Sequence, residues 1–320
     1  PSELTPNTSQ IVEKIINTVF EESFVAVIQG DAKVAQELLK EHWDYIFFTG
    51  SVSVGKIVAQ AAAPFLTPTT LELGGKNPCI IDETANIKLT AKRITWGKFF
   101  NGGQTCIAPD YIIIHNSVKQ QFIEALRNEI TVSYSSNTKE SADFARIINS
   151  NNFLRLTKML KNEKIIIGGD IDEESLFIAP TIIDEPSLES EVMKDEIFGP
   201  ILPILSYSNE DDIRKIILRY HKPLSLYVFS TNKRFSKKMI STYSFGGGTI
   251  NDTVIHFANP KLPFGGVGSS GTGAYHGKHT FYTFSHQKAI VKKGNWLDIP
   301  VRYAPYKGKT KLIKLFLKYF

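Results

Sequence analysis

Along the first sixty residues, stretches with apolar side chains at helical spacing alternate with short, continuous apolar runs. Residues 11–20 carry apolar side chains at helical spacing, whereas residues 24–28 form a continuous apolar run of the kind found in buried parallel strands. Helical spacing returns at 34–39, and a second apolar run at 45–48 precedes a helix predicted over 54–63. Strands alternating with helices predict right-handed crossovers and a doubly wound α/β sheet.

The same alternation continues through the second half of the chain. Apolar runs predict strands, and amphipathic stretches between them predict helices. The predicted strands cover residues 111–114, 165–167, 202–206 and 226–229, and the predicted helices cover 117–130, 152–162 and 210–220. This half therefore forms a second α/β unit in our interpretation.

Length and composition limit the possible functions. A chain of 320 residues is long enough for two domains, and 42% hydrophobic with 22% charged residues is ordinary for a soluble globular protein. The net charge of +5 is too small to indicate a nucleic-acid partner. No apolar run reaches the roughly 18 to 20 residues that a membrane-spanning helix needs. The sequence begins with Pro1 and with no strand before its first helix, which predicts the C-terminal part of a longer protein.

The two cysteines indicate different roles. Neither Cys79 nor Cys106 has a CxxC or metal-site spacing, so we expect no disulfide framework and a reducing, cytoplasmic setting. Cys79 lies in an apolar run and is interpreted as a buried, inert strand residue. Cys106 follows Gly-Gln-Thr among small and polar residues, and Glu72 lies upstream between two leucines and before a glycine pair. This pairing is typical of covalent catalysis, in which a cysteine captures the substrate and a carboxylate activates water.

The turn at residues 48–55 follows a predicted strand and opens a helix. Gly50 and Ser51 in that turn would let a pyrophosphate approach the free N–H groups of the helix. The turn is not GxGxxG, so by itself a plain structural turn explains it equally well.

Five separated segments resemble, in order, the motifs of the aldehyde dehydrogenase family. The C-terminal stretch at 273–286 is most similar to the class 3 branch, which oxidises medium- and long-chain or aromatic aldehydes. The five segments are residues 48–55, 71–76, 103–106, 196–200 and 263–268. The resemblance covers most of the chain and implies a partial doubly wound cofactor-binding sheet plus a second α/β catalytic domain. We place their boundaries at 1–74 and 75–272, with a C-terminal extension at 273–320.

The resemblance implies a role for each matching residue. Cys106 would form a thiohemiacetal with the aldehyde, hydride transfer would leave a thioester, and Glu72 would activate the hydrolytic water. The cofactor would be NAD, with NADP not excluded, and the aldehyde an aliphatic or aromatic one. The cofactor-binding positions implied are Glu3, Gly50, Ser51, Gly55, Glu196 and Phe198. The Cys106 N–H would supply half of an oxyanion hole. The family's asparagine for the other half has no counterpart here, and strands of the cofactor sheet are expected to be missing as well, so we predict weak or no turnover.

Several alternatives remain open from the sequence. Glu72 is also explained as a salt-bridged acid, and Glu196 as part of a solvated acidic run. The whole chain is alternatively an inactive remnant or subunit-binding module, or a Cys/Glu esterase or thioesterase that uses no cofactor. Three histidines lack the partners of a metal site, so no metal is expected: His276, His279 and His286.

The last fourteen residues interleave lysines with apolar side chains. Such a tail packs against a partner subunit or lies on an anionic membrane surface. The class 3 resemblance implies a homodimer, and peripheral membrane contact is the alternative for the tail.

Overall fold

The computed structural model describes residues 1–319 and divides the chain into two compact units, Pro1–Phe284 and Ser285–Phe320. The first unit contains all twelve strands of the described chain, arranged in sheets of seven, three and two strands. We describe the two units separately.

The largest sheet has the strand order β11-β10-β3-β4-β9-β8-β5. Its pairings are parallel except that β5 runs antiparallel to β8. The strands are β3 (Pro78–Ile81), β4 (Tyr111–His115), β5 (Ile165–Ile167), β8 (Thr181–Asp184), β9 (Ile201–Tyr207), β10 (Ser225–Phe229) and β11 (Gly247–Ile250).

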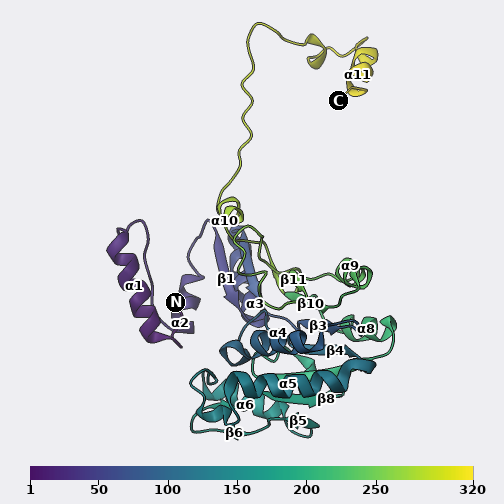
Figure 1. The fold of residues 1–320 in the computed structure, drawn as a ribbon. Helices are drawn as coiled ribbons and strands as arrows, with labels where there is room; N and C mark the ends of the chain where they lie inside the picture. Colours follow the sequence, from purple (N-terminus) through teal and green to yellow (C-terminus); the bar gives the residue numbers. More distant parts are fainter. Residues whose placement is uncertain (320) are drawn as a thin grey trace. The chain divides into compact units, whose positions relative to one another are not determined.

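Both faces of this sheet are buried, as its nearly continuous apolar strands predict. On one face, Ile112 and Ile114 of β4 join a core with helices α4 (Ile87–Phe99) and α5 (Lys119–Tyr134). On the other face, Ile113 joins a core with α6 (Ser150–Met159), α8 (Glu210–Ile217) and α9 (Lys233–Thr242). Figure 1 shows α4 and α5 alongside β3 and β4. Helices on both faces confirm the predicted doubly wound α/β architecture.

A second, three-stranded sheet has the order β1-β2-β12. Strands β1 (Ile46–Gly50) and β2 (Thr69–Leu73) are parallel, and β12 (Gly271–Thr272) runs antiparallel to β2. Helix α3 (Val52–Ala62) packs on this sheet through Gly55, where a Cβ atom would lie 2.5 Å from a methyl group of Leu73. The glycine therefore allows the Leu73 side chain to lie directly against the helix.

The predicted strand at residues 24–28 is wrong. These residues contain no strand, and Phe24 is 81% exposed. No strand among residues 1–319 pairs with them, so the ladder hydrogen bonds and apolar cover of a buried strand are missing. The helix before them is confirmed as α1 (Pro6–Val19), with an apolar face that stays exposed at Ile11, Ile15 and Val19. Helix α2 (Ala32–Leu38) confirms the next prediction.

The remaining elements are short. The first unit also contains β6 (Ile171–Asp172), β7 (Phe177–Ile178), α7 (Glu191–Lys194) and α10 (Lys278–Thr283), and the second contains α11 (Thr310–Leu317). Among the described residues, no helix has both the length and the apolar character needed to cross a membrane.

The turn between α4 and β4 generates a prediction about two neighbouring glycines. Gly102 (φ 61°) and Gly103 (φ 74°) are both left-handed, but only at Gly103 would a Cβ atom overlap the Gly199 carbonyl oxygen. We expect Gly102→Ala to cost about 1–2 kcal/mol through backbone strain. Gly103→Ala adds overpacking against a backbone atom, for about 2–5 kcal/mol in total. Urea unfolding of both variants measures the difference, and equal losses would contradict the described contact.

Candidate active site

Cys106 lies in a tight turn that joins η2 (Phe100–Gly103) to β4. The Ala108 N–H donates to the Thr105 carbonyl across the turn at 3.0 Å. The cysteine is half-buried against an apolar cluster formed by Ile107, Leu224, Phe264, Val254 and Tyr275. The thiol therefore lies in an apolar wall and is still reachable from solvent.

The environment of Cys106 disfavours its thiolate. Burial is the largest cause that raises the pKa of the thiol, to about 11, and the nearby carboxyls of Glu196 and Glu72 raise it further. Hydrogen bonds from the backbone N–H groups of Cys106 and Ile107 act in the opposite direction. The carboxyls of Glu196 and Glu72 are therefore close enough to Cys106 to affect the ionisation of its thiol.

Glu72 lies at the centre of the three-stranded sheet. Strand β2 pairs it with Thr49 of β1 and Gly271 of β12, and its side chain is 3% exposed. Neither carboxyl oxygen has a hydrogen-bond partner among the described residues, and burial raises the pKa of the carboxyl to about 8. Such a carboxyl is a suitable general base because it exchanges its proton near neutral pH. The alternative of a salt-bridged structural acid is wrong, since no cation pairs with Glu72 within residues 1–319.

Glu196 is held against the glycine pair that follows β2. A Cβ atom on Gly74 would overlap the Glu196 carboxyl, so only glycine permits this contact. Burial and the charge of Asp110 raise the pKa of Glu196 to about 8, although the Gly75 N–H, Arg155 and Lys76 favour its ionised form. The surroundings of Glu196 do not fit the alternative of a solvated acidic face.

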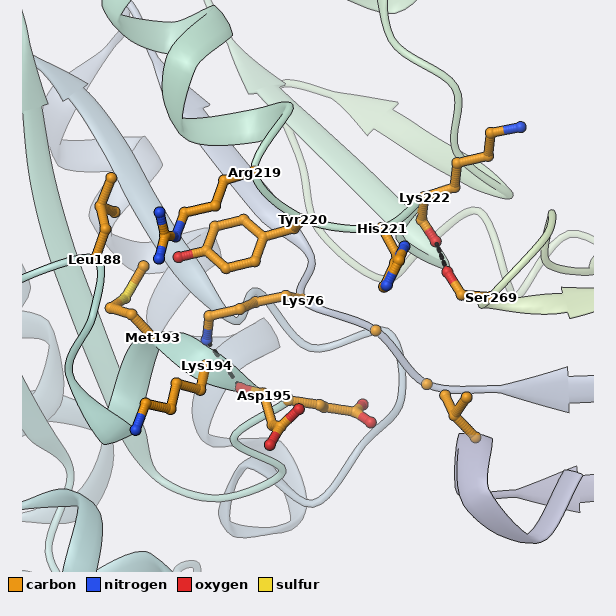
Figure 2. Close-up of a pocket in the computed structure, with 14 residues that line it drawn as sticks. Lys76, Leu188, Met193, Lys194, Asp195, Arg219, Tyr220, His221, Lys222 and Ser269 are labelled. Atoms are coloured by element: carbon orange, nitrogen blue, oxygen red, sulfur yellow. Dashed lines mark hydrogen bonds between the residues drawn. The ribbon is translucent and has the colours of Figure 1, made fainter. Parts of the chain in front are cut away.

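A pocket of about 600 Å³ opens beside this glycine pair (Figure 2). Val52, the first residue of α3, lines it together with Gly74, Gly75 and Glu196. Basic side chains line it as well: Lys76, Lys194, Arg219 and Lys222. Figure 2 shows Lys76 reaching the Asp195 carbonyl beside the ring of Tyr220. The walls thus combine a helix N-terminus, glycines, cations and the two carboxyls of Asp195 and Glu196, a set of groups that fits a ligand with phosphates and ribose hydroxyls.

The other predicted cofactor residues lie in different surroundings. Ser51 caps α3 by accepting a hydrogen bond from the Val54 N–H at 3.4 Å, and it directly precedes the pocket residue Val52. Gly50 ends β1, and Phe198 follows Glu196 with a left-handed backbone (φ 49°) and an exposed ring. Glu3 is exposed before α1 and does not line the described pocket.

Several buried polar residues at the site were not predicted from the sequence. Lys76 forms an ion pair with Asp110 (Nζ to Oδ2 2.6 Å) while both side chains are buried. Lys98 is also buried, and desolvation lowers the pKa of its ammonium to about 8. The sequence feature that could have indicated them is the polar pair Lys76-Asn77, which stands between Gly74-Gly75 and an apolar strand. Polar residues at the start of a buried strand need specific partners in the core. Among residues 1–319, no cluster of potential metal ligands occurs.

Comparison with known proteins agrees with this geometry. The aldehyde dehydrogenase family model matches residues 1–290. The chain belongs to the aldehyde dehydrogenase family. It is 50% identical to 4,4'-diaponeurosporen-aldehyde dehydrogenase of Staphylococcus aureus, over 99% of this chain and 70% of that relative. It is 48% identical to aldehyde dehydrogenase family 3 member A2 of Macaca fascicularis, over 92% of this chain and 60% of that relative.

Solved structures show the same family relationship. The structure described as the substrate-bound state of Staphylococcus aureus AldH superposes with a TM-score of 0.95 at 49% identity, over 99% of this chain and 70% of that one. An NAD-dependent aldehyde dehydrogenase from Sinorhizobium meliloti superposes with a TM-score of 0.82 at 25% identity, over 93% of this chain and 62% of that one. This aldehyde dehydrogenase chain thus spans about 60 to 70% of the length of these relatives.

The buried Glu72 carboxyl predicts a pH-dependent stability. Because its pKa is raised to about 8, the folded chain retains a proton that the unfolded chain has lost between about pH 4.5 and 8. Stability contributed by this group therefore falls as the pH rises through that window and levels off above it. We expect Glu72→Gln to match the parent Tm at pH 4.5 and to exceed it increasingly up to pH 8. The exposed Glu41→Gln is the control, and an equal Tm difference at every pH for Glu72→Gln would contradict the raised pKa.

Proposed function

We propose that this chain carries the catalytic centre for NAD(P)-dependent oxidation of an aldehyde to a carboxylic acid. The observation that carries the proposal is the proximity of a half-buried thiol, Cys106, to an unpaired buried carboxyl, Glu72, next to the pocket beside Glu196. Membership of the aldehyde dehydrogenase family supports the same reaction.

The proposed chemistry proceeds through covalent bonds on Cys106. Its thiolate adds to the aldehyde carbon, and the Cys106 N–H stabilises the charge that develops on the carbonyl oxygen. After oxidation the acyl group is a thioester on the sulfur. Glu72 accepts a proton from the water that attacks this thioester, and cleavage of the C–S bond releases the acid and the thiol.

A nicotinamide dinucleotide, when bound, supplies the two-electron acceptor for this oxidation. Glu196 would hold its ribose hydroxyls, Phe198 would contact the same ribose, and the Gly50-Ser51 turn would receive its phosphates. Cations and a helix N-terminus in the pocket support this proposal. The relatives include a dimeric NADP-preferring enzyme of Rattus norvegicus and an NAD⁺ complex from Mycobacterium tuberculosis, so we propose both cofactors.

The apolar wall around Cys106 supports an apolar aldehyde, of medium or long chain or aromatic, as the substrate. We propose a reducing, cytoplasmic setting, because the reaction requires Cys106 as a free thiol. We also propose a homodimer. Leu312, Leu315 and Leu317 of the tail are exposed between lysines, which suits packing against a second copy, with an anionic membrane surface as the alternative.

We further propose that chain 1–320 by itself turns over slowly. The exposed apolar face of α1 and the unpaired segment at 24–28 support this, because uncovered apolar surface favours aggregation over a well-ordered site. The family's asparagine that would supply the second oxyanion donor also has no counterpart in the sequence, and the loss of one such donor lowers turnover about 10²- to 10³-fold.

Calorimetry with NAD and with NADP, combined with NADH or NADPH formation from decanal at 340 nm, tests these proposals. We expect binding of at least one cofactor and slow, decanal-dependent turnover by purified chain 1–320. Cys106→Ala should abolish turnover and keep cofactor binding, whereas Cys79→Ala should keep both because Cys79 is fully buried in β3. Absence of binding by both cofactors would contradict the proposed pocket, and turnover by Cys106→Ala would contradict the nucleophile.

A further inference from the structure

Three consecutive carbonyl groups of the Cys106 turn are held by two buried side chains. The Asn77 amide nitrogen donates to the carbonyls of Cys106 (2.8 Å) and Ala108 (3.0 Å). The Tyr227 hydroxyl donates to the carbonyl of Ile107 between them (2.6 Å). Asn77 is 1% exposed and Tyr227 is fully buried, so these bonds are not exchanged with water.

The orientation of the Asn77 amide is itself fixed. Its oxygen accepts from the Ser225 N–H at 2.8 Å at the start of β10, and its nitrogen faces two carbonyls. Only one assignment of oxygen and nitrogen satisfies all three partners. The Asn77 backbone carbonyl also accepts from the Asp110 N–H at 2.9 Å, just before β4. Asn77 thus joins the Glu72 segment, the Cys106 turn and two strands of the large sheet.

The hydrogen bond to the Cys106 carbonyl has a consequence on the opposite side of the same peptide group. The Cys106 carbonyl and the Ile107 N–H belong to one planar unit and point in opposite directions. When Asn77 holds the carbonyl, the direction of the Ile107 N–H is fixed as well. The Ile107 N–H is one of the two backbone groups that lower the pKa of the Cys106 thiol.

We propose that Asn77 is a positioning residue for the Cys106 nucleophile: its amide holds the Cys106 carbonyl, which fixes the Cys106–Ile107 peptide and with it the direction of the Ile107 N–H next to the thiol. Its relevance to catalysis rests on the proposed role of Cys106 as the nucleophile. The ionisable groups that face the thiol are Glu72, Glu196, Tyr227 and Tyr275. A neutral substitution at Asn77 leaves all four in place, whereas Asn77→Asp would add a charge of its own.

The test is alkylation of Cys106 by iodoacetamide in chain 1–320, followed by mass spectrometry from pH 7 to 9.5. We expect Asn77→Leu to slow alkylation about three- to tenfold at each pH. Loss of one N–H partner raises the thiol pKa by about one unit, and the greater nucleophilicity of the more basic thiolate offsets part of the effect. This measurement needs neither cofactor nor turnover. Asn77 can therefore prove unimportant for the thiol while the proposed function holds, and it can prove important while the proposed function fails.

Tyr227→Phe is the matched control, because it removes an equally buried donor from the next peptide group, Ile107–Ala108. The N–H of that peptide donates to the Thr105 carbonyl and not to the sulfur. Burial raises the pKa of Tyr227 far above the pH range of the test, so its hydroxyl stays neutral and its removal changes no charge near the thiol. We therefore expect Tyr227→Phe to lower Tm as Asn77→Leu does and to leave the alkylation rate unchanged. Cys106→Ala gives the blank. If Asn77→Leu does not fold, Asn77→Ser, which keeps one donor, is expected to slow alkylation to a smaller extent. A folded Asn77 variant that reacts at the rate of Tyr227→Phe across the pH range would overturn the proposal.

Discussion

A buried ion pair joins the turn after strand β2 to the loop that carries Glu196. Lys76 Nζ lies 2.6 Å from Asp110 Oδ2 and donates to the carbonyls of Val192 in α7 and Asp195 just after it, while Asp110 accepts from the Ile197 N–H at 2.9 Å. Removing one partner of such a pair leaves an uncompensated buried charge, which is strongly destabilising. The segment that carries Glu196 is therefore fixed relative to the turn after β2, the strand of Glu72, and the rest of the site depends on this link.

The short segment at residues 72–77 accordingly organises the site from three sides. Glu72 supplies an unpaired carboxyl, Lys76 holds the Glu196 loop, and Asn77 holds the Cys106 turn. The glycine pair between them lets the Glu196 carboxyl approach the backbone. Burial raises the pKa values of Glu72, Glu196 and Cys106, and nearby carboxylates raise those of Glu196 (Asp110) and Cys106 (Glu196 and Glu72) further, so all three groups are mostly protonated near neutral pH. The proposed nucleophile Cys106 therefore has to lose its proton to a group in the site before it can attack an aldehyde.

The apolar runs at 45–48, 111–114, 165–167, 202–206 and 226–229 predicted strands that the structure contains, because strands buried on both faces are almost continuously apolar. The same rule failed at residues 24–28, where the pattern is apolar but no described strand provides a partner. Short motifs pointed to Cys106, Glu72 and Glu196, whose roles stay predictions, whereas the buried contacts of Asn77 and of the Lys76–Asp110 pair were not predicted. Their partners lie 29 to 148 positions away in the sequence, and only the folded chain brings such groups together. Glu3 remains a prediction from the motif alone.

Trapping the acyl intermediate tests the central claim most directly. Chain 1–320 carrying Glu72→Gln is incubated with NAD or NADP and decanal, and its peptides are analysed by mass spectrometry. If Cys106 is the nucleophile and Glu72 the base for hydrolysis, a decanoyl adduct accumulates on the Cys106 peptide, with one reduced cofactor formed per adduct. The parent chain should show much less adduct because hydrolysis proceeds. An adduct on Cys79, or cofactor reduction without any adduct on Cys106, would contradict the account.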